Sequence, residues 1–328
     1  MDPKAIRQQS EAAYKQWKRR WRKHAQIHAA FPHKSMQDFE NSGVGKAILC
    51  VANGYSLEEN IETIKKHQKS VDIICCDKTL GVLIENGITP TYVIVCDSKV
   101  NYRKYMKPWE DKLSRTTLFM NVTGNPQWSH NGNWKEKFFF VNKDIINSQD
   151  EFCKLSQCEN IIPAGTNVSN AMIILLTLCD NSGRRNFFGY DKMLLIGFDY
   201  SWKYGGKYYA FDEAGGGKVK YMRHSYIITP SGEFAYTSGN LAFSMQWVSE
   251  YIKTFKLPVV QCGKDSILTL GKTYDLEEQI LYSYKREDRK KVKELVKELR
   301  SLTNRMEHLK NGINNIAKDH YWGFARTV

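Results

Sequence analysis

Between residues 46 and 270 the chain alternates short apolar runs with polar, helix-compatible stretches. Each apolar run ends in turn-forming or polar residues, which is the rhythm of an α/β fold. Runs without polar alternation are typical of strands covered on both faces, and therefore of a largely parallel sheet. The pattern predicts strands at residues 47–52, 72–76, 91–96, 116–122, 137–141, 160–163, 193–198 and 259–262.

Two helices are predicted outside this region. Residues 4–30 form a basic amphipathic pattern in which Tyr14, Trp17 and Trp21 recur at helical spacing. We expect these aromatics to dock on the main domain, with a membrane or nucleic-acid anchor as the alternative. A heptad alternation near the C-terminus predicts a long helix that pairs with a second subunit, with folding back on the chain as the alternative. Its apolar positions are Val292, Leu295, Leu299, Leu302, Met306, Leu309, Ile313 and Ile316.

The chain thus divides into a helical extension and linker (1–45), a nucleotide-binding α/β domain (46–270) and a C-terminal helical extension (271–328). We expect a Rossmann-like, mostly parallel sheet with helices on both faces. Such sheets bind ligands beyond the carboxyl ends of their strands. Polar residues follow the predicted strands directly and should form one rim there: Asn53, Gly54, Ser56, Asp77, Asp97, Asn121 and Asp199.

Two helix starts are candidate anion sites. After the first strand, Gly54 lets the backbone approach a ligand, and free N–H groups can hold a phosphate. Ser56, with Glu59 three residues later, is equally a capping box. The second start follows Gly165, Thr166 and Asn167. Thr166 as the N-cap is compatible with a ligand contact, because a helix start leaves several N–H groups free.

Asp77 and Asp97 each follow an apolar strand immediately. Their carboxylates should project into the crevice, where they would hold a divalent metal or ribose hydroxyls. The alternative is that each caps the next helix or loop.

Residues 203–240 are rich in glycine and aromatic residues and too long for a simple turn, so we expect a lid over the crevice. His224 is its natural general base, with a structural role as the alternative. Its tyrosines would bind the phosphate oxygens of a leaving group: Tyr208, Tyr209, Tyr221 and Tyr236.

Charge adds candidate partners. The 328 residues carry a net charge of +13, concentrated near residues 15–24 and 283–293. Such ends attract polyanions, although solvated helix faces give the same counts.

Compartment is indicated by two features. There is no apolar run long enough to span a bilayer, and the first residues lack a hydrophobic leader, so we expect a cytoplasmic protein. The eight cysteines lie mostly in apolar runs, which favours a reducing compartment. Cys153 and Cys158 lack companion ligands for a metal.

Several segments in order carry a family resemblance. VANGYSL, CDKTLGVLIENGITPTYVIVCDS, AGTNVSNAM, LLIGFDYSW and SGEFAYTSGNLAFSMQWVSEYIK resemble the MptE-like 6-hydroxymethylpterin diphosphokinases, a family that includes the Maf flagellin glycosyltransferases. The resemblance covers about residues 46–270. Tyr55 stands where the family usually has proline.

The same architecture is similar to the bacterial family 42 sialyltransferases, which use CMP-linked sugars. That resemblance implies that Asn53, Ser56, Thr166 and Asn167 contact the nucleotide and that Asp199 anchors the crevice. The nucleotide set would also include Gly54, Asp77, Gly165, Tyr208, Tyr236 and Thr237. The sialyltransferase histidine falls near Thr237, so His224 would replace it as the base.

We therefore predict a transferase, with glycosyl transfer from a nucleotide sugar such as a CMP-sugar favoured. His224 or Asp199 would deprotonate the acceptor hydroxyl, carried by a glycan, a protein or modified nucleic acid. One alternative is diphosphate transfer from ATP to a pterin-like alcohol, with Mg²⁺ held by Asp97 and Asp77. Another is a non-catalytic nucleotide- or nucleic-acid-binding module.

Overall fold

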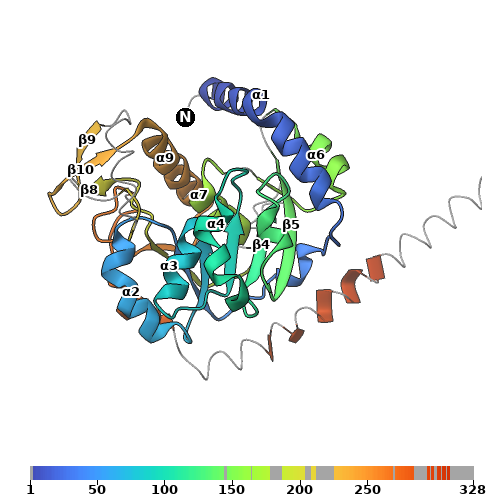
Figure 1. The fold of residues 1–328 in the computed structure, drawn as a ribbon. Helices are drawn as coiled ribbons and strands as arrows, with labels where there is room; N and C mark the ends of the chain where they lie inside the picture. Colours follow the sequence, from blue (N-terminus) through green and yellow to red (C-terminus); the bar gives the residue numbers. More distant parts are fainter. Residues whose placement is uncertain are drawn as a thin grey trace, which may run out of the picture. The chain divides into compact units, whose positions relative to one another are not determined.

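The computed structural model describes residues 3–143, 146–163, 165–177, 187–203, 208–211, 225–268 and 270–283, and short helical pieces between 294 and 310. The chain divides into one compact unit at residues 1–284 and a second at 285–328. The sheet and its covering helices belong to the first unit (Figure 1).

An eight-stranded sheet forms the centre of the first unit, in the order β11-β7-β1-β2-β3-β4-β5-β6. Every neighbouring pair in it is parallel. The predicted α/β class and all eight predicted strands are therefore confirmed. The strands are β1 (Ala47–Val51), β2 (Asp72–Cys76), β3 (Tyr92–Val95), β4 (Thr117–Asn121), β5 (Glu136–Lys143), β6 (Ile161–Pro163), β7 (Lys192–Ile196) and β11 (Val259–Gln261).

Helices cover both faces of the sheet (Figure 1). Successive residues of a strand point to opposite faces, so a fully apolar strand supplies two cores. In β1, Leu49 and Val51 join one buried cluster and Ile48 and Cys50 join the other. The helices are α1 (Pro3–His28), α2 (Ser56–His67), α3 (Leu80–Glu85), α4 (Tyr102–Tyr105), α5 (Gln127–His130), α6 (Gln149–Ser156), α7 (Val168–Thr177), α9 (Gly239–Thr254) and α10 (Leu276–Ser283). Short 3₁₀ helices occupy Met36–Phe39, Asp77–Thr79 and Lys107–Lys112.

The first helix docks on the main domain, as its aromatic stripe predicts. Tyr14 and Trp21 both lie edge-on to Phe152 of α6, with ring centroids 6.4 and 6.2 Å apart. Deeper in, His28 is fully buried between the carbonyl of Val122 (2.7 Å) and the hydroxyl of Ser129 (3.0 Å). These contacts fix α1 over the ends of β4 and β5.

The segment predicted to be a lid contains a second sheet. Its described parts form β8 (Trp202–Lys203), β9 (Ser225–Ile228) and β10 (Phe234–Thr237), paired antiparallel in the order β8-β10-β9. These short strands were absent from the sequence prediction, because frequent glycines and aromatics hide a two-residue period. Tyr221 and His224 lie outside the described residues.

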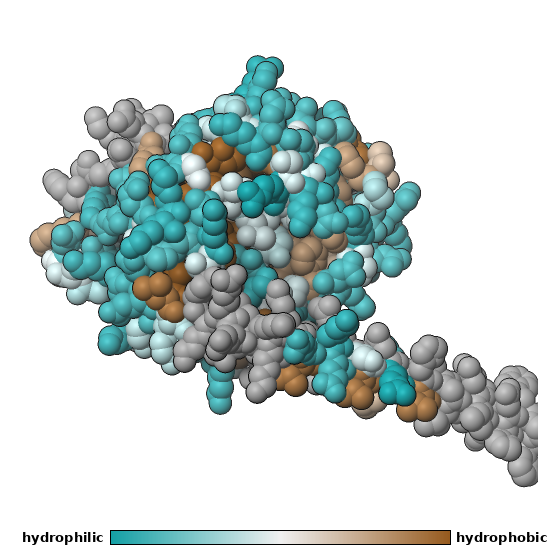
Figure 2. Space-filling model, turned by 90° about the horizontal axis from the view of Figure 1, so that it is seen from below, coloured by the Kyte–Doolittle hydropathy of each residue, from teal (hydrophilic) through white to brown (hydrophobic). Residues whose placement is uncertain are grey.

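The second unit is helical wherever it is described. Its apolar side chains are exposed (Figure 2): Leu295, Leu302, Met306 and Leu309. The other predicted heptad positions, Val292, Leu299, Ile313 and Ile316, lie outside the described residues. Among the described helices of the whole chain, none combines the length and hydropathy needed to cross a bilayer.

Candidate functional site

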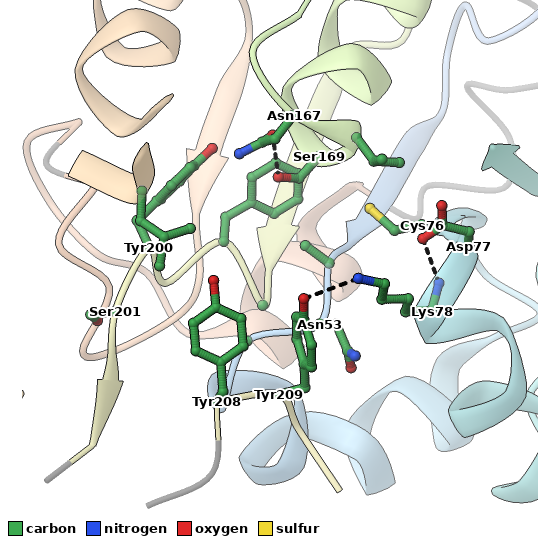
Figure 3. Close-up of a pocket in the computed structure, with 16 residues that line it drawn as sticks. Asn53, Cys76, Asp77, Lys78, Asn167, Ser169, Tyr200, Ser201, Tyr208 and Tyr209 are labelled. Carbon is green, nitrogen blue, oxygen red and sulfur yellow. Dashed lines mark hydrogen bonds between the residues drawn. The ribbon is translucent and has the colours of Figure 1, made fainter. Parts of the chain in front are cut away.

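A cavity of about 250 Å³ opens at the carboxyl ends of β7, β1 and β2, where a parallel sheet places its ligands. Asn167 and Ser169 from the start of α7 line it on one side, and Tyr208 and Tyr209 from the segment after β8 line it on the other (Figure 3). Six predicted site residues line it: Asn53, Gly54, Asp77, Asn167, Tyr208 and Tyr209. Lys78, Ser169, Tyr200 and Ser201 also line it.

The turn after β1 forms the floor. A Cβ atom at Gly54 would lie 2.3 Å from Asp199 Oδ2 and 2.6 Å from the Gly197 carbonyl oxygen, so only glycine fits there. The side-chain oxygen of Asn53 is buried and accepts no hydrogen bond from the described residues. This oxygen is available to a donor group of a ligand in the cavity.

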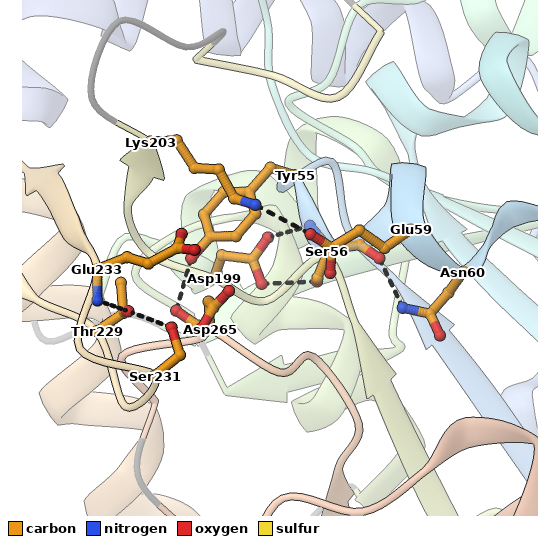
Figure 4. A network of polar contacts seen from close by, with 10 residues as sticks. All are labelled: Tyr55, Ser56, Glu59, Asn60, Asp199, Lys203, Thr229, Ser231, Glu233 and Asp265. Carbon is orange, nitrogen blue, oxygen red and sulfur yellow. Dashed lines mark hydrogen bonds and ion pairs between the residues drawn. The ribbon is translucent and has the colours of Figure 1, made fainter.

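Ser56 and Asp199 are paired with each other beneath the floor (Figure 4). Asp199 accepts from the backbone N–H of Ser56 at 2.8 Å and from its hydroxyl at 2.6 Å. The hydroxyl in turn accepts from Gly197 N–H at 2.9 Å. Burial raises the pKa of Asp199 to about 6, although both bonds from Ser56 lower it. The pair caps α2 and ties β1 to β7, and neither residue lines the cavity.

Asp77 and Lys78 bring charge into the cavity. Asp77 is 3% exposed; its Oδ1 accepts from Lys78 N–H at 2.7 Å, while its Oδ2 is buried without a partner among the described residues. Burial raises the pKa of Asp77 to about 6, and the nearby Asp97 also raises it, while Lys78 lowers it. The sequence pattern does not single out Lys78, because nothing distinguishes this residue from the other lysines except its place after Asp77.

Two tyrosines complete one wall. Lys78 Nζ donates to the Tyr209 hydroxyl at 3.0 Å (Figure 3). Tyr208 packs edge-on against Tyr209, with ring centroids 4.6 Å apart, and lies tilted against Trp202, with ring centroids 5.1 Å apart. Burial lowers the pKa of Lys78, but Tyr209 and Asp77 together raise this pKa by more than burial lowers it. The net shift is upward, so the ammonium stays charged.

Two residues of β10 that were predicted to contact the nucleotide do not line the cavity. Tyr236 stacks on Trp202, with ring centroids 5.9 Å apart. Thr237 is buried and donates to the Tyr200 carbonyl at 2.8 Å. Neither side chain lines the cavity.

At the start of α7 the N-cap is Asn167 and not Thr166. Asn167 Oδ1 accepts from Asn170 N–H and from the Ser169 hydroxyl, both at 2.8 Å. Thr166 is exposed and accepts instead from the Asn170 side chain at 2.7 Å. Gly165 packs so closely on this turn that a Cβ would meet the Ala171 nitrogen at 2.7 Å. Of the three residues predicted here, Asn167 lines the cavity, and Gly165 and Thr166 do not.

Asp97 lies apart from the cavity. Its side chain is exposed and accepts from Lys99 N–H at 2.8 Å, closing a local turn. Within the described part of the chain, no cluster of three or more His, Cys, Asp or Glu side chains is arranged to hold a metal ion. Asp77 is the carboxylate that faces the cavity.

Comparison with known proteins identifies the family. The profile described as 6-hydroxymethylpterin diphosphokinase MptE-like matches residues 22–205, more than half of the chain. The chain belongs to this family. The matched range holds every residue that lines the cavity except Tyr208, Tyr209 and Leu241. The family resemblance seen in the sequence is thereby confirmed, and the family is named for a diphosphokinase, which is a transferase.

Among solved structures, the chain is similar to the Maf glycosyltransferase from Magnetospirillum magneticum AMB-1, with a TM-score of 0.51 and 13% identity. The match covers 81% of this chain and 41% of that one, so this chain spans less than half of the relative's length. At this identity the similarity establishes a shared fold. No curated protein matches the sequence.

Proposed function

We propose that the cavity binds the phosphate-bearing part of a nucleotide-activated donor and that the protein is a glycosyltransferase using a nucleotide sugar, with CMP-sugars the first candidates. The observation that carries the proposal is Lys78. Its ammonium group faces a cavity at the strand ends of a Rossmann-like sheet and is surrounded by hydroxyl and amide groups. A fixed cation in a confined polar cavity suits a phosphate.

Each lining group has a role in this proposal. Lys78 offsets the negative charge that grows on the departing phosphate, and the hydroxyls of Tyr208 and Tyr209 donate to its oxygens. The free oxygen of Asn53 accepts from a ribose hydroxyl or a base amino group. Asn167 and the backbone at the start of α7 add dipoles of the sign that favours an anion.

Asp77 is the proposed general base. Asp77 lines the cavity and its buried Oδ2 has no partner among the described residues, and a pKa near 6 leaves the carboxylate ionised at neutral pH yet basic enough to take a proton. The acceptor hydroxyl gives its proton to Asp77 while its oxygen bonds to the anomeric carbon. The bond from that carbon to the nucleotide phosphate breaks, and the electron pair leaves on the phosphate. Asp199 acts as a positioning residue through Ser56, and His224 stays a prediction.

Diphosphate transfer from ATP to an alcohol is the second candidate. The family's description and the unpartnered Asp77 oxygen favour it. Mg²⁺ is commonly held by one or two carboxylates together with substrate phosphates, so Asp77 would serve as the protein ligand. Asp97 would have to turn inward to join it.

A thermal-shift titration tests the proposal. CMP, CDP, UDP, GDP and ATP are each added with and without Mg²⁺ to the wild type, to Lys78→Met and to Lys65→Met, an exposed lysine of α2 that serves as control. A ligand that binds the native state raises Tm by mass action. We expect a metal-independent shift with CMP or another pyrimidine nucleotide that is lost only in Lys78→Met.

A shift with ATP that requires Mg²⁺ would select the diphosphokinase instead. If no nucleotide raises Tm, the non-catalytic alternative would replace the glycosyltransferase proposal. A shift in Tm that persists in Lys78→Met would indicate that the nucleotide binds outside this cavity.

A further inference from the structure

A second cavity, of about 210 Å³, lies over the carboxyl ends of β3, β4 and β5. Cys96, Asn121 and Asn142 form its floor, each at or next to the end of one strand. It therefore occupies the same edge of the sheet as the first cavity. Its residues have no part in the proposed nucleotide site.

The two cavities lie over neighbouring strands. Cys76 lines the first and ends β2, while Cys96 lines the second and follows β3. The strands β2 and β3 are hydrogen-bonded neighbours, with Cys76 opposite Ile94. The charge of Asp97, which follows Cys96 of the second cavity, raises the pKa of Asp77 at the first cavity. A molecule in the second cavity would thus sit next to the proposed base.

Helix α1 forms the roof of the second cavity. Ser10, Ala13 and Trp21 line it from one face of the helix, and Phe152 of α6 lines it from the side. Contacts of Tyr14 and Arg22 with Glu151 hold the helix in place. Ser10, Ala13 and Tyr14 precede residue 22, where the family match begins. This chain thus supplies the roof with residues outside the matched region.

The lining of this cavity mixes apolar surface with uncharged polar groups. Amides and hydroxyls come from Asn121, Asn142 and Thr123, and aromatic surface comes from Trp21 and Phe152. The side-chain oxygen of Asn142 is buried and accepts no hydrogen bond from the described residues. No charged side chain occurs among the described residues that line it. Amides beside aromatic faces suit a ring that carries hydroxyl groups and no charge.

We propose that this second cavity is the acceptor site, and that the acceptor presents one uncharged, hydroxylated ring such as a sugar unit. The inference rests on the proposed glycosyl transfer and adds the acceptor class to it. The volume is below the roughly 300–1,000 Å³ of drug-sized sites, which fits a single ring. The rest of a larger acceptor would extend outward along α1.

Saturation-transfer NMR with methyl glycosides of glucose, galactose, mannose and N-acetylglucosamine tests the inference on the full chain. The variant Ala13→Phe fills the cavity from the roof. Its matched control is Ala12→Phe, the neighbouring exposed position of α1. We expect at least one glycoside to bind the wild type and Ala12→Phe and to lose its signal in Ala13→Phe.

Asn142→Ala is a second, milder variant, which keeps the test valid if Ala13→Phe does not fold. Loss of one buried hydrogen bond should weaken glycoside binding about tenfold. The nucleotide-induced thermal shift should be unchanged in both variants, and this readout separates the two proposals. An unaltered nucleotide shift without any glycoside signal overturns the acceptor assignment alone.

Two other results would also overturn it. A glycoside signal that persists in Ala13→Phe and Asn142→Ala would place sugar binding elsewhere. 6-Hydroxymethylpterin is used as a second probe. If it binds the wild type but neither variant, and no glycoside binds, the cavity would be assigned to a flat heterocycle.

Discussion

Two buried aspartates at the strand ends differ in what their oxygens contact. Both have a pKa raised to about 6 by burial. Both oxygens of Asp199 accept hydrogen bonds from Ser56, whereas Asp77 keeps one oxygen without a partner. A buried carboxylate whose bonds are complete supports structure, and one with a free oxygen has capacity for a ligand or a proton. We therefore expect opposite effects when each is replaced.

Replacing Asp77 by Asn should stabilise the protein near neutral pH. The folded pKa of Asp77 lies above its unfolded value of 3.8, so the stability it contributes is present in acid and is lost as pH rises through about 6. Asp77→Asn should exceed the wild type by about 2 kcal/mol near pH 7.5, and the difference should vanish near pH 3.5. Urea unfolding at both pH values measures it, with exposed Asp150→Asn as control. If the free energy of unfolding depends on pH in the same way in the variant and the wild type, the burial of the Asp77 carboxylate does not destabilise its charged form.

Replacing Asp199 by Ala should destabilise the protein. The change leaves the N–H and hydroxyl of Ser56 buried without their acceptor, and broken buried networks cost about 3 kcal/mol. Urea denaturation gives the free energy of unfolding, with exposed Asp38→Ala as control. A loss below about 0.5 kcal/mol would mean that the Ser56 contacts do not hold the turn.

At the scale of elements, α1 determines whether the second cavity exists. The helix is basic and mostly exposed, and its attachment depends on a few apolar and aromatic contacts. Phe152 contacts both Tyr14 and Trp21 and is 3% exposed. A short helix, α6, thereby positions a much longer one.

Phe152→Ala should release the N-terminal half of α1. The loss of a buried phenylalanine costs about 3–5 kcal/mol, and here the cost falls on a local docking contact. Hydrogen exchange followed by mass spectrometry should show faster exchange in residues 7–22, while β1 and β2 stay protected. Lys154→Ala on the exposed side of α6 is the control. Uniform acceleration across the sheet would instead indicate global destabilisation.

At the scale of the whole molecule, the unit from residue 285 carries exposed apolar side chains on a helical segment. Met306 is 72% exposed and Leu309 67%. Helices with an exposed apolar heptad stripe commonly associate. Assembly through this segment stays a prediction.

Truncation after Tyr284 should lower the particle mass to that of a monomer. Multi-angle light scattering measures the mass of the full and shortened chains, and Leu302→Glu in the full chain should reproduce the effect by placing a charge in the stripe. The nucleotide-induced thermal shift should persist in the truncated protein, because the cavity lies within residues 1–284. The same number of subunits per particle in the two chains would contradict association through the heptads.

The sequence alone determined the sheet. Apolar runs such as 47–51 and 72–76 have one stable environment, a sheet buried on both faces, and polar residues at their ends had to lie at one edge. The docking face of α1 followed from helical spacing in the same way. These features depend on periodicity and hydrophobicity, which are local properties of the chain.

Only the tertiary structure decided which polar residues face the cavities. Ser56 and Asp199 bond to each other, Asp97 is exposed, and Lys78 reaches the cavity. The direction of a side chain after a strand depends on how segments distant in the sequence pack against it, as at Gly54 beneath Asp199. The second cavity likewise exists because residues near 10–21 cover the ends of strands more than seventy residues later. Local patterns carry no information about such contacts, because their partners are set by the packing of the whole fold.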